Sequence, residues 1–217
     1  MDKAAIFIDQ GYFSRILEYY GLQELANNGG IPEFKNGLDY LTFSEKLCRI
    51  HNSERFRTYI YDALPYQHNP PNAWESAHLA EKQKFKSYLD ALPSVMTRYG
   101  ICLEIPNKNC HCFKTGAFTT PCKHITQKGV DVRFSIDLVS LATDKRIDKA
   151  ILITGDSDFI PAINYAREVN MKIILYYLKQ GSITLHKGLP FVCDERFQLD
   201  KQFLQDCLFS AALINRR

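Results

Sequence analysis

Short apolar runs alternate along the chain with stretches whose apolar residues recur at helical spacing. Residues 4–8 are apolar and rich in Ile and Phe, and residues 11–21 place Phe13, Ile16, Leu17 and Tyr20 on one helix face. Further strands are predicted at 56–63, 100–105, 149–155 and 172–178, and further helices at 41–51, 73–92, 131–144 and 159–170. Strands that are apolar on both faces and alternate with helices favour a parallel sheet covered on each side. The pattern therefore predicts an α/β fold.

Two segments depart from this alternation. Residues 106–127 are rich in Cys, Lys, Thr and Asn and predict an irregular insertion, whereas residues 198–217 have the pattern of a C-terminal amphipathic helix. The chain contains no repeat or long linker, and a length of 217 residues favours a single domain over 1–217.

Composition restricts the protein class only broadly. The chain is 46% hydrophobic and 24% charged, and no apolar run approaches the roughly 18 residues of a membrane helix. The opening "MDKAAIFIDQ" lacks the features of a secretory signal, so we expect a cytoplasmic protein without a membrane partner. A net charge of +3 permits a polyanionic partner but does not by itself indicate one.

Three aspartates lie where predicted strands end. Asp9 ends the first strand, and Asp156 and Asp158 follow the strand at 149–155. Because ligands bind outside the carboxyl ends of parallel strands, these acids are expected to share one edge, and Asp131 begins the helix that leads into the same strand. Each has a simpler explanation when taken alone, since Asp131 or Asp158 could cap a helix and Asp9 could form a turn.

The simpler explanation weakens when the four carboxylates are considered together. Two carboxylates about 4 Å apart repel by roughly 4 kcal/mol at an effective dielectric of 20, and a divalent cation is the simplest remedy. Oxygen ligands without imidazole suit Mg²⁺ or Mn²⁺, which are ions of phosphate chemistry. Asp137 ranks below the four because it points roughly 240° around the helix from Asp131.

The segments "IFIDQGYF", "QKGVDVRFSIDLVSLA" and "AILITGDSDFIPAINYAREVNMKIILYYL" resemble the NYN domains of the LabA-like group, within the PIN-like nuclease superfamily. The resemblance runs from about Ala4 to about Phe197. It implies a Rossmann-like sheet and hydrolysis of phosphodiester bonds, most often in RNA. It also implies an acidic Mg²⁺ or Mn²⁺ pocket, whose residues by position are Asp9, Asp131, Asp156 and Asp158, with Asp137 as an outer member. The family commonly has Asn where this chain has Tyr12, and a phenol orients a ligand differently.

The expected function is therefore that of a metal-dependent RNA endonuclease, in which a metal-bound water attacks the phosphate. Single-stranded RNA is the expected partner, and DNA stays open as a second polymer. Ser157 lacks the surroundings of a nucleophile and is interpreted as a turn residue or a supporting hydroxyl. Two alternatives remain: an inactive module that binds RNA or protein, and a phosphatase or nucleotidase. No role is assigned to His51, His68, His78 or His186.

The insertion contains a cluster of potential soft metal ligands. Cys110, Cys112, Cys122 and His124 provide two short pairs joined by a loop, which suits a structural Zn²⁺ site. Reduced thiols without a metal are the alternative, and a disulfide is the third choice. Lys114 and Lys123 with the nearby aromatic residues could contact single-stranded nucleic acid, and Lys128 could contact a phosphate. Solvated surface lysines remain an equally good interpretation.

Overall fold

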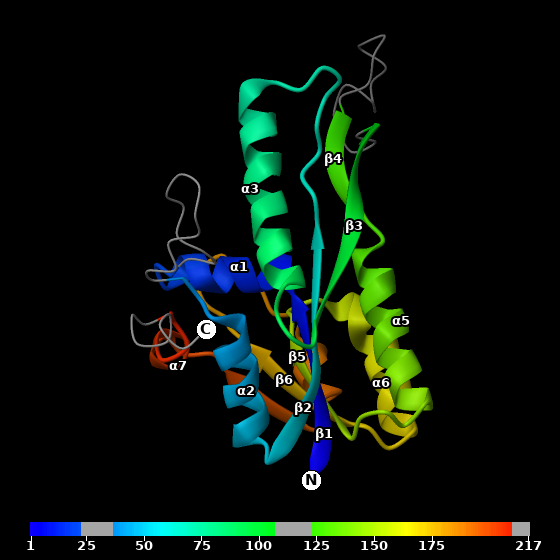
Figure 1. Cartoon of the computed structure of the whole chain (residues 1–217). Coiled ribbons are helices and arrows are strands. Elements are labelled where there is room, and N and C mark those ends of the chain that lie inside the picture. The colour runs from blue at the N-terminus through cyan, green and yellow to red at the C-terminus, as the bar shows by residue number, and fades with distance from the viewer. Residues whose placement is uncertain (23–36, 107–122, 210–217) are drawn as a thin grey trace.

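The computed structural model describes residues 1–22, 37–106 and 123–209. Within these residues, seven strands form one sheet in the order β4-β3-β2-β1-β5-β6-β7 (Figure 1). The strands are β1 (Asp2–Asp9), β2 (Ser53–Ala63), β3 (Val95–Pro106), β4 (Lys123–Lys128), β5 (Lys149–Ile153), β6 (Lys172–Tyr177) and β7 (Glu195–Gln198). Every neighbouring pair is parallel except β3 and β4, which are antiparallel. The predicted α/β fold is confirmed.

Helices cover both faces of the sheet. They are α1 (Gln10–Tyr19), α2 (Tyr40–Ile50), α3 (Ala73–Asp90), α5 (Val130–Thr143), α6 (Ile160–Glu168) and the short α7 (Lys201–Gln205), with 3-10 turns η1 (Ser157–Phe159) and η2 (Leu189–Phe191). Successive side chains of β1 point to opposite faces of the sheet, so the core consists of two clusters, one on each face. Ile6 and Ile8 pack in the same cluster as residues of α1 and α2, whereas Ala5 and Phe7 pack with residues of α5 and α6. No helix in the described ranges is long and apolar enough to cross a membrane.

The structure corrects three sequence predictions about elements. The segment predicted as irregular ends in strand β4, which forms hydrogen bonds with β3. The residues of β4 are mostly polar and exposed, so their own pattern does not indicate a strand. Strand β7 was not predicted, because four mostly exposed residues at a sheet edge show no apolar pattern. The predicted C-terminal helix is confirmed only over a short part of its described residues. Helix α7 ends at Gln205, and Leu208 then forms a β-bridge with Leu38; residues 210–217 lie outside the described residues.

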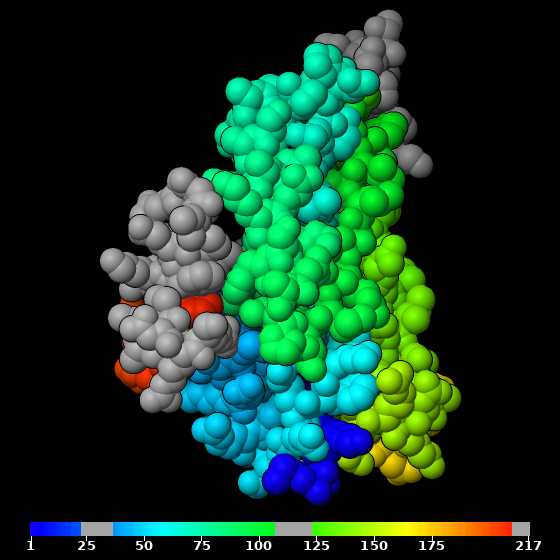
Figure 2. All heavy atoms as spheres, viewed as in Figure 1, coloured from blue at the N-terminus to red at the C-terminus, as the bar shows by residue number. Residues whose placement is uncertain are grey.

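The strand order creates a crevice at the carboxyl ends of the central strands. Strand β1 lies between β2 and β5, and the chain continues outward from these two neighbours in opposite directions, to β3 and to β6. The loops at the carboxyl ends of β1 and β5 therefore diverge and leave a crevice between them. Beside this edge, α3 and the β3–β4 ribbon project together from the body of the molecule (Figures 1 and 2).

Candidate active site

Asp9 and the loop after β5 are joined through one hydroxyl group. Asp9 Oδ2 accepts a hydrogen bond of 3.2 Å from Thr154 Oγ1, and the same hydroxyl oxygen accepts one of 3.2 Å from the backbone N–H of Asp156. Asp9 Oδ1 accepts a further bond of 3.2 Å from the backbone N–H of Tyr12 and so caps α1. Thr154 is buried and was missed from the sequence, although it directly precedes the quoted "GDSD". Its hydroxyl fixes the Asp9 carboxylate against the Asp156 loop.

The negative charge of the Asp9 carboxylate is destabilised by its surroundings. Burial raises its pKa from 3.8 to about 6, against the two hydrogen bonds that lower it. The negative charges of Asp131 and Asp156 contribute to the same rise, which places these two carboxylates within electrostatic reach of Asp9. A cation bound beside Asp9 would relieve both effects, because it offsets the lost hydration and the repulsion together.

Asp131 and Asp158 lie around Asp156, and neither is the cap that the simpler interpretation expected. Asp156 itself caps η1, since its Oδ1 accepts a bond of 3.0 Å from the N–H of Asp158. The N-cap of α5 is Gly129, at a φ of 83°, and Asp131 follows it in the first turn. Burial, then the charges of Asp156 and Asp158, raise the pKa of Asp131. Three predicted acids thus influence one another, although both Asp131 and Asp158 are exposed.

Asp9 and Asp156 line a cleft of about 570 Å³. Its full lining is Asp9, Tyr12, Arg15, Gly155, Asp156, Ser157, Thr184, Leu185, His186 and Lys187. The backbone N–H of His186 donates a bond of 3.0 Å to Gly155 O, which holds the segment after β6 against the loop after β5. The acids therefore face basic groups from α1 and from this segment. Arg15, His186 and Lys187 were all missed from the sequence, because no motif surrounds them.

Tyr12 and Gly155 determine the shape of the cleft wall. The Tyr12 hydroxyl donates a bond of 2.8 Å to Leu178 O and accepts one of 3.0 Å from Leu178 N. The phenol is therefore occupied by the chain after β6, and the ring of Tyr12 contributes to the cleft. A Cβ atom at Gly155 would lie 2.4 Å from Tyr12 Cε2 and 2.6 Å from Thr184 O. Only glycine allows the chain to pass between these two groups.

Asp137 is not part of the cleft. Its Oδ2 accepts bonds of 3.0 Å from Tyr61 Oη and 3.0 Å from Arg98 Nε, so a guanidinium group already neutralises its charge. The sequence prediction that Asp137 is an outer metal ligand is not supported by this arrangement.

The predicted zinc ligands and basic contacts fall mostly outside the described residues. Cys110, Cys112, Cys122 and Lys114 lie there, whereas His124 and Lys128 are exposed on β4. In the described part of the chain, no group of three or more His, Cys, Asp or Glu residues is arranged to hold a metal ion. The zinc site and the basic contacts stay predictions.

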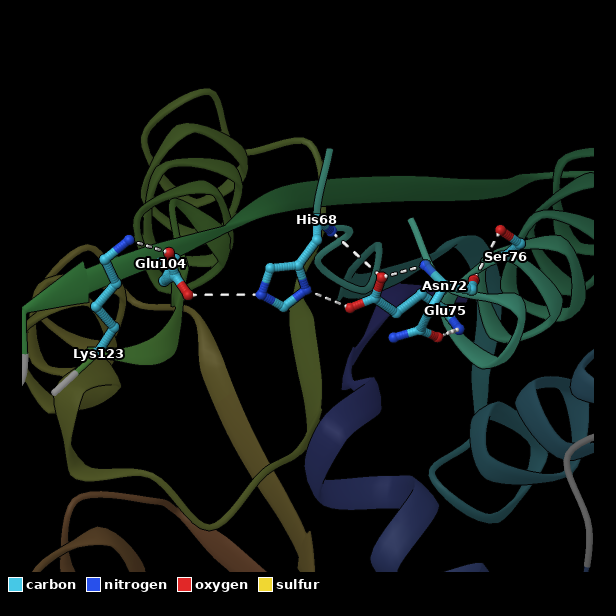
Figure 3. A network of polar contacts seen from close by, with 6 residues as sticks. All are labelled: His68, Asn72, Glu75, Ser76, Glu104 and Lys123. Carbon is cyan, nitrogen blue, oxygen red and sulfur yellow. Dashed lines mark hydrogen bonds and ion pairs between the residues drawn. The ribbon is translucent and has the colours of Figure 1, made fainter. Parts of the chain in front are cut away.

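Lys123 takes part in a polar network near the outer end of the β3–β4 ribbon, where it pairs with Pro106 (Figure 3). Its Nζ lies 2.7 Å from Glu104 Oε2, and Glu104 Oε1 lies 3.7 Å from His68 Nε2. His68 Nδ1 in turn lies 2.5 Å from Glu75 Oε1, and Glu75 forms a capping box with Asn72 at the start of α3. Hydrogen bonding to Glu75 raises the pKa of His68. The network joins α3 to the ribbon and gives His68, which had no predicted role, a structural one.

Two carboxylates of the cleft are of the kind that a hard divalent cation binds, and within the described residues no third His, Cys, Asp or Glu joins them in a metal-binding group. Asp9 and Asp156 offer carboxylate oxygens, and Mg²⁺ characteristically uses one or two carboxylates together with water molecules and substrate phosphates. The pKa of Asp9 is raised mainly by burial and also by neighbouring negative charges, and a bound cation would offset both. Arg15 and Lys187 lie on the cleft wall and could contact the phosphate oxygens that such a cation would polarise.

Comparison with known proteins gives a family and several similar proteins, two of which are described here. The model of the NYN domain matches residues 3–198. An uncharacterized protein of Methanocaldococcus jannaschii is 34% identical over 84 residues, which are 37% of this chain and 35% of that protein. The alignment thus spans about a third of that relative. The crystal structure of a protein of unknown function from Vibrio parahaemolyticus has a TM-score of 0.55 and 16% identity, covering 94% of this chain and 96% of the other. At that identity, the similarity supports the fold alone.

Proposed function

The chain belongs to the NYN domain family, and we propose that it is a metal-dependent endonuclease that hydrolyses phosphodiester bonds in single-stranded RNA. NYN domains belong to the PIN-like nuclease superfamily, which suggests nuclease activity. The observation that supports the proposal best is the pairing of Asp9 and Asp156 in one cleft, fixed through Thr154 and facing basic side chains. Membership of the LabA-like group, based on "KGVDV" and "GDSDF", is part of the same proposal.

In this proposal the acidic residues of the cleft bind the metal ion and the basic residues bind the substrate phosphate. Asp9 and Asp156 would hold Mg²⁺ or Mn²⁺, with Asp131 and Asp158 adding negative potential beside them; bound there, the cation would polarise the phosphate and acidify a water. Arg15 and Lys187 bind the phosphate oxygens. Thr154 keeps the Asp9 carboxylate oriented, because its hydroxyl is fixed between two partners. Ser157 has no part as a nucleophile in this scheme.

The test is cleavage of a labelled single-stranded RNA with Mn²⁺ by the wild type and by Asp156→Asn. Asn is also a good N-cap, so the variant is expected to retain η1 and the fold. We expect cleavage by the wild type and a rate lower by about 100-fold or more in the variant, since a metal ligand is lost. Asp137→Asn is the matched control, because Arg98 and not the cleft contacts its carboxylate. A circular RNA substrate distinguishes internal cleavage from attack at an end.

Two other results would favour the remaining alternatives. Retention of RNA without cleavage, unchanged by Asp156→Asn, would support an inactive binding module. Release of inorganic phosphate from nucleotides, with the RNA left intact, would support a phosphatase. A nuclease and a phosphatase would both use the acidic cleft to hydrolyse a phosphate ester, and they differ in the length of the substrate.

A further inference from the structure

A second hollow adjoins the acidic cleft, and Leu185 and Lys187 line both. This second hollow measures about 430 Å³. Its full lining is Tyr177, Lys179, Leu185, Lys187, Pro190, Phe191 and Gln198. It therefore lies at the carboxyl ends of β6 and β7, next along the sheet from the cleft at β1 and β5. The two hollows therefore lie next to each other along the carboxyl edge of the sheet, with Leu185 and Lys187 between them.

The second hollow presents an aromatic side chain with unusual exposure. Phe191 is 78% exposed at the end of η2, although an apolar ring of that size is ordinarily buried. Arg196 holds the ring from one side, with its guanidinium 5.9 Å from the ring centroid and its Nη1 donating a bond of 3.2 Å to Pro190 O. Tyr177 contributes a second, half-buried ring. Exposed aromatic rings held in place are the stacking surfaces that single-stranded nucleic acids use.

The charges of this hollow complement a phosphate backbone. Lys179 and Lys187 are both exposed, and within the described residues neither forms an ion pair with a carboxylate. Lys187 lies on the wall that separates the two hollows, where it can contact the phosphate that links a nucleotide in one to a nucleotide in the other. A mononucleotide would occupy only the acidic cleft and leave the aromatic hollow unused.

We propose that the hollow formed by Tyr177, Lys179, Lys187 and Phe191 binds the nucleotide next to the one attacked, so that the preferred substrate is a single-stranded polymer. The base of this nucleotide stacks on Phe191, and the two lysines contact its flanking phosphates. A duplex is disfavoured, because its bases are already stacked on one another. The inference rests on the proposed nuclease function and adds the part of the substrate that the site recognises.

Binding is tested in the Asp156→Asn background, which prevents cleavage, by fluorescence anisotropy with a labelled single-stranded 12-mer in Mg²⁺. Phe191→Ala is expected to weaken binding by about 10-fold, because one stacking contact is lost. Trp74→Ala is the matched aromatic control, since Trp74 is 72% exposed on α3 and lines neither hollow. Both side chains are exposed, so neither change should disturb the fold, and circular dichroism checks this. A mononucleotide competitor should bind the Phe191→Ala protein and its parent equally.

The lysines are tested by the salt dependence of the same binding. Lys179→Gln should reduce the slope of log K against log salt by about 0.7, the value for one phosphate contact on a single strand, whereas Lys84→Gln on the exposed side of α3 should leave it unchanged. Equal affinity and equal slope in the variants and controls would overturn the inference.

Cleavage separates the failure of this inference from that of the proposed function. If wild-type protein cleaves RNA and Phe191→Ala cleaves it with unchanged KM, the subsite is wrong and the nuclease stands. If the wild type cleaves no polymer, the proposed function itself has failed.

Discussion

Replacement of Asp9 by Asn should stabilise the metal-free protein at neutral pH. The pKa of Asp9 rises from 3.8 to about 6, mainly through burial. An acid with a raised pKa in the folded state loses its proton first in the unfolded chain. The free energy of unfolding therefore falls as the pH rises from about 4 to about 6, and the loss is complete above that range. At about 1.4 kcal/mol for each pH unit, the ionised carboxylate costs the fold about 3 kcal/mol.

Asn removes this cost but loses one hydrogen bond. Its amide oxygen can still accept from the backbone N–H of Tyr12, whereas its NH₂ group cannot accept the bond from Thr154, which we value at about 1 kcal/mol. The expected net gain is about 2 kcal/mol at pH 8, shrinking towards zero near pH 4.5. Urea denaturation in EDTA at both pH values measures it, with the exposed Asp144→Asn as the matched control.

Added Mn²⁺ should reverse the order of stability. The wild type at pH 8 is expected to gain stability with Mn²⁺ concentration, because the ion binds the folded state, and Asp9→Asn should gain much less. If Asp9→Asn is no more stable than the wild type in EDTA at pH 8, the carboxylate is not strained by burial and repulsion, and the reasoning fails.

Three further predictions concern other parts of the molecule. Gly155→Ala should lower the free energy of unfolding by about 1–3 kcal/mol in urea denaturation, since its Cβ would meet an aromatic carbon at 2.4 Å and a carbonyl oxygen at 2.6 Å; unchanged stability would contradict the contact. Asp137→Asn should lower stability by about 1 kcal/mol through the loss of the Arg98 pair while RNA cleavage continues, and loss of cleavage would place this acid in the site after all. The pKa of His68 is raised by Glu75, so its charge stabilises α3 below pH 6.5 and ceases to do so as the pH rises through the raised pKa. His68→Gln should therefore increase amide exchange at the start of α3 at pH 6 more than at pH 8.5, and an equal effect at both would refute the charge contribution.

Elements with two buried faces or a clear amphipathic pattern could be predicted from the sequence. The apolar residues of β1, β5 and β6 leave few alternatives to buried parallel strands, and α5 begins one residue from its predicted start. Strands β4 and β7 could not be predicted in the same way, because their residues are mostly exposed and only their neighbours provide hydrogen bonds. The end of α7 depends on the bridge between Leu208 and Leu38, a long-range contact with no local signal.

Of the four aspartates that the sequence predicted for the site, Asp9 and Asp156 line the cleft, whereas Asp131 and Asp158 are not among its lining residues, and none of its basic residues was predicted. Asp9 and Asp156 end adjacent strands, so the rule of converging strand ends was enough to bring them together. Arg15 lies on a helix and His186 in an irregular segment, and both line the cleft. The position of these residues in the sequence does not indicate which way their side chains point. Thr154 could have been recognised only from its place between the two acids in space.

Diffraction at the manganese absorption edge, from a crystal grown with Mn²⁺, would locate the ion itself. An anomalous peak is expected in the cleft, within coordination distance of the carboxylates of both Asp9 and Asp156, and it should disappear in a crystal of Asp156→Asn. A cleft without a peak at millimolar Mn²⁺, with these two carboxylates bonded only to protein and water, would contradict the proposal that they form a metal site.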